Sequence, residues 1–313
     1  MPMKTYKPSN RISASGYRWL FLSTVISSCV VGGVFSFLGS FIYLFLVFPG
    51  FMGAIGGCAT HLAVKSGKVR NPAIASLVGA ITGVAIYGAM LGFDYGGFRR
   101  QMAQEFQEHY GADIQNVVAE SNGTATENDI IRFAIDDLLT EQTGQSGFLG
   151  YLHWTAQDGF SLDSTSNSSE MLVSGIGVWL FWLLEIGLVV VISSRIGFGA
   201  AVEPFCEQCQ EWYEKPQRLG NVSQDASAQF TALLQKAHYE EAGAMIRPMV
   251  EIDVPSVEVH LQTAPKNKRT NDVILVLSKT SLGKYKTVQL NQFLLGVLSP
   301  KDKIQLENAI SRT

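Results

Sequence analysis

The chain has 313 residues, of which 47% are hydrophobic and only 16% charged, and its formal net charge is −3 at pH 7. Soluble domains carry roughly 25% charged residues, and here the charge is missing in long stretches. No Lys, Arg, Asp or Glu occurs from Trp19 to Val64 or from Asn71 to Phe93, and Met171–Ser194 carries Glu185 alone. Because a spanning helix needs roughly 20 apolar residues, an ordinary soluble protein is excluded. The sequence predicts a mostly α-helical, polytopic membrane protein.

The first uncharged stretch is too long for a single span at about 1.5 Å of rise per residue. The pair Gly39-Ser40 is the natural break, and it predicts transmembrane helices over about 18–38 and 41–64, joined by a tight hairpin. Pro49 then lies inside the second helix and is expected to kink it. One long tilted helix followed by a short piece after Pro49 remains the alternative.

Two further transmembrane helices are expected over 72–93 and 171–193. Basic residues are enriched on the cytoplasmic side of membrane proteins, which orients the chain. The arm 1–17 and the loop before residue 72 are basic and contain no acid, so we expect both in the cytoplasm. The basic residues of the arm, together with the first position of the predicted helix, are Lys4, Lys7, Arg11 and Arg18. Those of the loop are Lys65, Lys68 and Arg70. Segment 94–170 then lies outside, and 194–313 returns to the cytoplasm with both termini inside, as in a bacterial inner membrane or its equivalent.

The outer segment 94–170 is strongly acidic and is predicted to be helical. Phe98–Tyr110 is expected to form a helix that leaves the membrane. Thr126 and Asp129 match a capping box, and Gly144 is expected to end the helix that follows. The apolar face of that helix contains Ile131, Ala134, Ile135, Leu138 and Leu139. The aromatic stretch 146–154 is expected to lie on the membrane surface or to pack on these helices.

The cytoplasmic region 194–313 has the pattern of a small α+β domain. Strands are expected at Val257–Leu261, Asp272–Ser278 and Tyr285–Leu290, after a helix from Ser223 to about Met245. Ser299 followed by Pro300 predicts the start of a final helix, because Ser favours the N-cap and Pro the first helical position. This region is the one that can fold as an independent domain.

Small residues recur every four positions in the predicted membrane helices. They are Thr24, Ser28, Gly32 and Ser36 in the first helix, Gly53 and Gly57 before His61 in the second, and Ala75, Gly79 and Gly83 before Tyr87 in the third. Such spacing lets helix backbones approach closely in lipid. It predicts a tightly packed bundle, and the same faces are candidates for contact with a second copy of the chain.

Two polar residues inside the membrane are candidates for function. Charged groups in hydrocarbon are costly and usually face the protein interior with a partner. Counted from the expected helix ends, Glu185 and His61 both lie in the cytoplasmic half of the bilayer. We therefore expect a Glu185–His61 contact that relays protons or holds a cation. The alternative is a neutral Glu185 hydrogen-bonded to a backbone carbonyl or a Ser, with a packing role only.

Cys206 and Cys209 form a CxxC pair in the cytoplasmic region, where a stable structural disulfide is not expected. A closed zinc site needs four ligands, and the other two cysteines lie in predicted membrane helices. His260 and His238 are the nearby replacement ligands. Three interpretations remain open: a zinc-ribbon-like knuckle without metal, a zinc site completed by histidine or across a dimer, and a redox pair or plain thiols.

The second half of a zinc ribbon would fall at 262–267, between two expected strands. Ala264 and Asn267 have the two-residue spacing of ribbon ligands, but neither side chain binds metal in such sites. The pattern is therefore stronger evidence for a ribbon-like shape than for bound zinc.

No P-loop, G-x-S-x-G or other catalytic motif is visible, so the sequence does not predict an enzyme. The basic cluster 266–269 is too small to indicate nucleic-acid binding. The expected function is that of a membrane anchor, scaffold or signalling component whose cytoplasmic domain binds a protein partner. The alternative is a transporter or an ion- or proton-conducting protein that uses Glu185 and His61.

Overall fold

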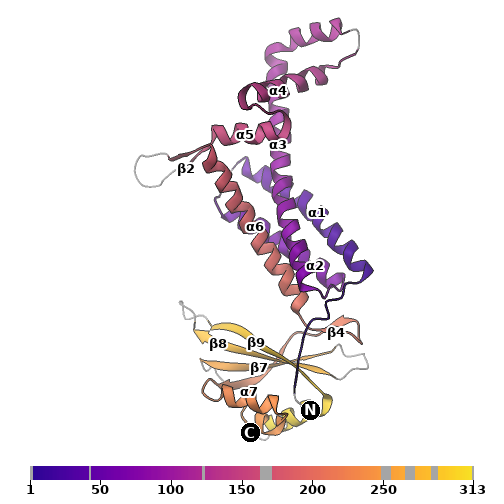
Figure 1. Cartoon of the computed structure of the whole chain (residues 1–313), viewed down its shortest axis with the longest axis vertical. Coiled ribbons are helices and arrows are strands. Elements are labelled where there is room, and N and C mark those ends of the chain that lie inside the picture. The colour runs from indigo at the N-terminus through magenta and orange to yellow at the C-terminus, as the bar shows by residue number, and fades with distance from the viewer. Residues whose placement is uncertain are drawn as a thin grey trace. The chain divides into compact units, whose positions relative to one another are not determined.

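The computed structural model describes residues 3–41, 44–121, 124–162, 171–247, 255–264, 272–282 and 288–311. It divides into two compact units (Figure 1). The first, called the membrane unit, contains Ser13–Gly67 and Ala73–Ala200. The second, called the sheet unit, is assembled from three separate segments: Met1–Ile12, Lys68–Pro72 and Ala201–Thr313.

Four helices are long and apolar enough to cross a membrane, as the sequence predicted. They are α1 (Ala14–Gly39), α2 (Val47–Ser66), α3 (Pro72–Glu120) and α6 (Ile176–Val202). α1 ends at Gly39 beside the C-cap residue Ser40, so the predicted break in the first apolar stretch is confirmed. The helices are therefore separated where glycine weakens helix formation.

The predicted kink at Pro49 is wrong, because α2 begins at Val47 and not near residue 41. Pro49 consequently lies in the first turn of the helix. Backbone N–H groups in the first turn have no acceptor within the helix, so a proline there removes no hydrogen bond. Leu46, just before the helix, has a φ of 58°, which turns the chain into α2.

The four spans alternate in direction, as successive crossings of a bilayer require. α1 and α3 run in the same direction, and α2 and α6 run opposite to them. The contacts that define these directions are Thr24–Thr82 and Ser36–Asp94 for α1 and α3, Gly16–Gly67 and Phe35–Phe48 for α1 and α2, and Ser76–Ser194 and Tyr87–Glu185 for α3 and α6.

The small residues do bring the helix backbones together. A Cβ atom added to Gly79 or Gly83 of α3 would lie 2.6 or 2.8 Å from Ser193 of α6. Gly53 and Gly57 of α2 face α6 in the same way, and Gly32 of α1 faces α3. The predicted tight packing is confirmed. These glycines pack within one chain, and the contact with a second copy that the sequence suggested stays a prediction.

α3 is a single helix from Pro72 to Glu120, although the sequence predicted separate helices over 72–93 and Phe98–Tyr110. Two adjacent glycines, Gly96 and Gly97, cost about 1 kcal/mol each in a helix. Packing outweighs this cost, because the outer part of α3 contributes to an apolar core with α4 (Glu127–Thr143). The core contains Phe98, Met102, Phe106, Ile114, Ile131, Ile135 and Leu139.

The rest of the outer domain follows the sequence closely. Thr126 and Asp129 form the predicted capping box of α4, and Gly144 ends that helix with a φ of 76°. The aromatic stretch forms α5 (Gly147–Asp158), which packs against α4. Two short strands, β2 (Phe160–Leu162) and β3 (Met171–Val173), pair before α6.

α6 extends to Val202, nine residues beyond the predicted end at 193. Arg195 and Gly197 therefore lie inside the helix. Gly197 does not interrupt it, because the glycine packs against the backbone of Ala75 in α3 and that contact stabilises the helix. The extension changes the estimated depth of every residue in α6.

The sheet unit contains an antiparallel five-stranded sheet in the order β1-β9-β8-β7-β6. The strands are β1 (Lys4–Thr5), β6 (Gln217–Ser223), β7 (Ser256–Thr263), β8 (Val273–Leu282) and β9 (Val288–Leu298). The predicted strands Val257–Leu261 and Asp272–Ser278 correspond to β7 and β8. Of the third predicted strand, residues 288–290 fall in β9 and residues 285–287 lie outside the described residues. β1 and β6 were not predicted, since β1 is only two residues long and β6 contains Gly220, a break in its pattern. Five paired strands exceed what a ribbon contains, so the zinc-ribbon shape does not describe the whole domain.

Three helices cover one face of this sheet (Figure 1). They are α7 (Ser227–Gln235), α8 (Tyr239–Ala244) and α9 (Pro300–Ile310). The single helix predicted from Ser223 to Met245 is divided into α7 and α8 at Ala237, which has a φ of 63°. Ser299 caps α9 with Pro300 at its start, as predicted. The hydrophobic core between the helices and the sheet contains Phe230, Leu234, Val259, Leu275 and Leu306.

The close packing of α3 on α6 yields a first prediction. Replacing Gly83 by leucine places a side chain against the backbone of Val190, so the variant should lose about 1–3 kcal/mol of unfolding free energy. Gly88 on the same helix has open space around its Cβ position, and Gly88→Leu is the matched control. Thermal unfolding in detergent micelles measures both. Equal stability of the two variants would contradict the packing described here.

Candidate functional site

Glu185 of α6 is the one acidic residue in its membrane stretch, and only 1% of it is exposed. The Tyr87 hydroxyl of α3 donates a hydrogen bond of 2.7 Å to its Oε2 atom. Tyr87 is also 1% exposed. The surrounding cluster is apolar and contains Val31, Phe35, Met52, Ile86, Met90 and Val189. The pair thus joins two membrane helices inside the bundle.

This hydrogen bond has a clear physical role. A carboxyl group in an apolar medium is costly unless it is hydrogen-bonded, and a polar contact between helices adds to their association in lipid. Tyr87 supplies the hydroxyl and lies at the end of the Ala75-Gly79-Gly83 series, which brings α3 against α6. Sequence reasoning noted Tyr87 in that series but did not identify it as the partner of Glu185.

The structure separates Glu185 from His61, the partner expected from the sequence. Gly53 of α2 packs on Val189 and Gly57 on Ile196, so α2 and α6 advance together. His61 lies one turn beyond Gly57 and therefore past the level of Ile196. Glu185 lies eleven residues before Ile196, more than about 16 Å along the helix axis. The expectation failed because depth was counted from residue 193, whereas α6 continues to Val202.

The CxxC pair lies in a tight hairpin, as its sequence predicted. β4 (Phe205–Cys206) pairs with β5 (Glu211–Trp212). The Cys209 N–H donates to Cys206 Sγ at 3.0 Å, and the Gln210 N–H donates to the Cys206 carbonyl at 2.8 Å. The Phe205 and Trp212 rings contact edge to face with centroids 5.0 Å apart. We call residues 205–212 the knuckle.

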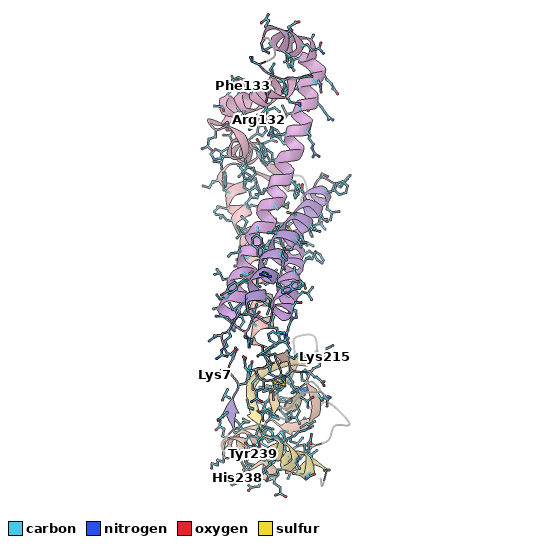
Figure 2. The ribbon with its side chains drawn as sticks, turned by 90° about the vertical axis from the view of Figure 1, so that its right-hand side faces the viewer. Lys7, Arg132, Phe133, Lys215, His238 and Tyr239 are labelled. Atoms are coloured by element: carbon cyan, nitrogen blue, oxygen red, sulfur yellow. A yellow bond between two sulfur atoms is a disulfide. The ribbon has the colours of Figure 1, made fainter. Side chains whose placement is uncertain are left out.

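Both knuckle cysteines are 4% exposed and are joined to each other as a disulfide, which the predicted cytoplasmic location did not lead us to expect. The two candidate histidines have other partners. His260 Nε2 lies 3.0 Å from Glu258 Oε2 on β7, and His238 Nδ1 lies 2.8 Å from Glu241 Oε1. Lys215, just after the knuckle, and His238 lie at opposite ends of the sheet unit (Figure 2).

The donor set around the knuckle does not fit a zinc site. Within the described ranges, no group of three or more His, Cys, Asp and Glu side chains is placed to hold a metal ion. Of the expected second half of the ribbon, Ala264 follows β7 directly, and Asn267 lies outside the described residues.

Arg70 packs on the knuckle, which no sequence signal predicted. Only 6% of this residue is exposed, and its guanidinium forms an ion pair with Glu207 and lies 4.7 Å from the centre of the Phe205 ring. Its backbone exchanges hydrogen bonds with the N-terminal segment at Asn10 and Arg11. Arg70 is one of the basic residues from which the orientation in the membrane was predicted. In the structure it is buried, and it links the N-terminal segment to the knuckle within the sheet unit.

Two tyrosines complete the surroundings of the knuckle. The Phe205 N–H donates to the Tyr6 hydroxyl oxygen at 3.0 Å. Burial raises the pKa of Tyr6, and burial followed by the charges of Asp272 and Tyr6 raises the pKa of Tyr213 to about 12. Both phenols are therefore neutral at physiological pH. The N-terminal segment, the loop before α3 and the knuckle form one packed cluster.

No known family model matches the chain, and neither a curated protein nor a solved structure is similar to it.

The Tyr87–Glu185 hydrogen bond yields a second prediction. Tyr87→Phe removes the donor while keeping the ring, and it should lower the unfolding free energy by about 1–3 kcal/mol because the buried carboxyl group loses this hydrogen bond. Adding Glu185→Leu to this variant should restore most of the loss, since both polar groups are then absent. Unfolding in detergent measures the series, with the exposed Tyr17→Phe as control. A double variant less stable than Tyr87→Phe would argue against the pair as described.

The third prediction concerns alkaline pH. The folded pKa of Tyr213 is raised to about 12 from the ordinary value of 10.0. The stability that its neutral phenol contributes is therefore complete below pH 10 and is lost as the pH rises toward 12. The phenolate absorbance of the wild type minus that of Tyr213→Phe should titrate near pH 12 in the folded protein. The same difference should titrate near pH 10 in denaturant.

Proposed function

We propose that the chain is a non-enzymatic, multi-pass membrane protein that anchors or signals to a cytoplasmic protein partner through its sheet unit. The observation that supports this most directly is that the sheet unit is assembled from three separate segments of the chain. The chain passes between the two units after Ile12, Gly67, Pro72 and Ala200. A domain that exists only to be displayed needs one connection, whereas this one is joined along the chain to all four membrane helices.

The cytoplasmic location rests on charge. Lys4, Lys7, Lys68 and Arg70 come from the two basic segments that the positive-inside rule assigns to the cytoplasm. Both segments belong to the sheet unit. A compact domain lies on one side of a bilayer, so the rest of this unit goes with them. Both termini are then cytoplasmic, in a bacterial inner membrane or an equivalent membrane.

A signalling role is favoured by the continuity of α3. Pro72, the first residue of α3, belongs to the sheet unit, and the outer part of α3 packs on α4 through Phe98 and Phe106. A helix of 49 residues spans about 74 Å without a break. It begins directly after Arg70 and Asn71, whose contacts lie in the knuckle cluster. A partner that displaces the outer domain would thus move a segment of the sheet unit through one continuous helix.

The sheet unit offers a candidate surface for the cytoplasmic partner on α9. Ile304 is 55% exposed, and no other large hydrophobic residue among the described residues of this unit is exposed to that extent. It borders a shallow cavity of about 270 Å³ lined by Thr263, Asp272, Lys303 and Glu307. An apolar side chain beside a polar rim is the arrangement of a small protein–protein contact.

This proposal yields the fourth prediction. A photoreactive residue at Asn308, exposed one turn beyond Ile304, should form one recurrent adduct with a cytoplasmic protein in host membranes. Ile304→Asp should reduce that adduct roughly tenfold or more, as loss of a central apolar contact does. Gln305→Asp changes an exposed neighbour that lines a different cavity and is the control. Adducts insensitive to Ile304→Asp, or their complete absence, would contradict the proposed surface.

The alternative function, conduction through Glu185 and His61, has less support. The two residues lie far apart along the bundle, because Gly57 of α2 packs on Ile196, eleven residues beyond Glu185 on α6. A proton relay needs closely spaced polar groups. Proton or cation flux in liposomes that is abolished by Glu185→Gln would establish conduction in place of the signalling role.

A further inference from the structure

A groove at the outer end of the membrane unit is not used by the proposed signalling role. It lies between the end of α1 and the middle of α3, with α5 beside it, and has a volume of about 680 Å³. Its lining includes Ser36, Phe37, Asp94, Gly97, Arg100 and Tyr151. Gly97 has open space where a side chain would begin, so the hollow depends on the missing side chain.

The groove contains one acid and one base that do not pair with each other. Asp94 is half-buried and accepts a hydrogen bond from the Ser36 hydroxyl, which uses one of about four acceptor positions on a carboxylate. Arg100 is exposed and forms no ion pair within the described part of the chain. The two positions are six residues apart on α3, about 9 Å along the axis. Opposite charges held apart in one groove complement a zwitterion.

The groove also lies at the depth of lipid headgroups. Asp94 follows directly on the uncharged stretch Asn71–Phe93, so it marks the end of the span. The Tyr151 ring contacts the rings of Tyr95 and Phe98, and Tyr and Trp residues gather at the membrane–water boundary. On the membrane side, Phe37 is 65% exposed and Phe93 is 48% exposed. Together they form an apolar wall along which an acyl chain fits.

We propose that this groove binds one phospholipid with a primary-ammonium headgroup, of the phosphatidylethanolamine class. The Arg100 side chain, like other long side chains on a helix, inclines toward the N-terminal end of α3 and therefore toward the level of Asp94. The headgroup then lies across the groove, with its ammonium group donating hydrogen bonds to Asp94 and its phosphate contacting Arg100, and an acyl chain follows Phe37 and Phe93. A trimethylammonium headgroup has no N–H to donate to the carboxylate, and an anionic glycerol headgroup offers Asp94 no cation. Charge-assisted hydrogen bonds are stronger than those between neutral groups, and this headgroup would form them at both of its charged groups. Selectivity among headgroups should therefore be measurable.

The test is native mass spectrometry of the full chain released from vesicles of phosphatidylethanolamine, phosphatidylcholine and phosphatidylglycerol in equal amounts. The wild type should retain phosphatidylethanolamine about tenfold or more over the other two lipids. Asp94→Asn should abolish this preference. Gly97→Leu should reduce retention of all three lipids, because Gly97 lines the groove and its Cβ position is open to a new side chain.

Two control variants keep the test independent of folding. Gly88→Leu adds the same side chain to α3 outside the groove, and Arg99→Gln removes a neighbouring charge that lies 5.8 Å from the Tyr95 ring centre. Both should retain phosphatidylethanolamine as the wild type does. Retention unchanged in Gly97→Leu, or equal retention of phosphatidylglycerol, would overturn the proposal. Displacement by soluble glycerophosphoethanolamine at equal concentration would show that the headgroup alone is the ligand and would refute a lipid site.

Discussion

The close approach of α6 to α2 and α3 is the constraint on which the membrane unit depends. Lipid tails are as apolar as leucine, so helices in a bilayer gain little from burying hydrophobic surface and associate through close packing and polar contacts. Gly53, Gly57, Gly79 and Gly83 permit that packing because no Cβ atom separates the backbones. The same approach brings Tyr87 within hydrogen-bonding distance of Glu185. Packing and polar contact therefore act on one interface.

A different constraint organises the sheet unit. Its three segments are distant in the sequence, and the knuckle holds them together through Arg70 and Tyr6. A buried guanidinium is tolerated only with charged or hydrogen-bonding partners, and Glu207 and the Phe205 ring contact this one. The CxxC hairpin is thus best understood as a packing element that joins the loop before α3 to the domain. This explains its aromatic neighbours without a metal ion.

The proposed signalling role and the proposed lipid site depend on different features of the helix bundle. The signalling proposal needs a continuous α3, so that the outer domain and the segment around Arg70 move together. The lipid groove needs only the local gap that Gly97 leaves beside Asp94 and Arg100. A bound lipid at that gap would brace α1 against α3 where Ser36 and Asp94 already form a hydrogen bond. The groove therefore provides a place where membrane composition can influence the same helix.

The sequence by itself determined the features that depend on nearby residues. These are the four apolar helices, the break at Gly39, the capping boxes at Thr126 and Ser299, and the three central strands. Tertiary structure decided what depends on distant residues. Pro49 lies at a helix start, α3 runs through Gly96-Gly97, α6 continues to Val202, and Glu185 meets Tyr87 in place of His61. The physical reason is that a local helix-breaking preference is worth about 1 kcal/mol, and contacts with another helix readily exceed it. Where such contacts form depends on helix register, which no local pattern reveals.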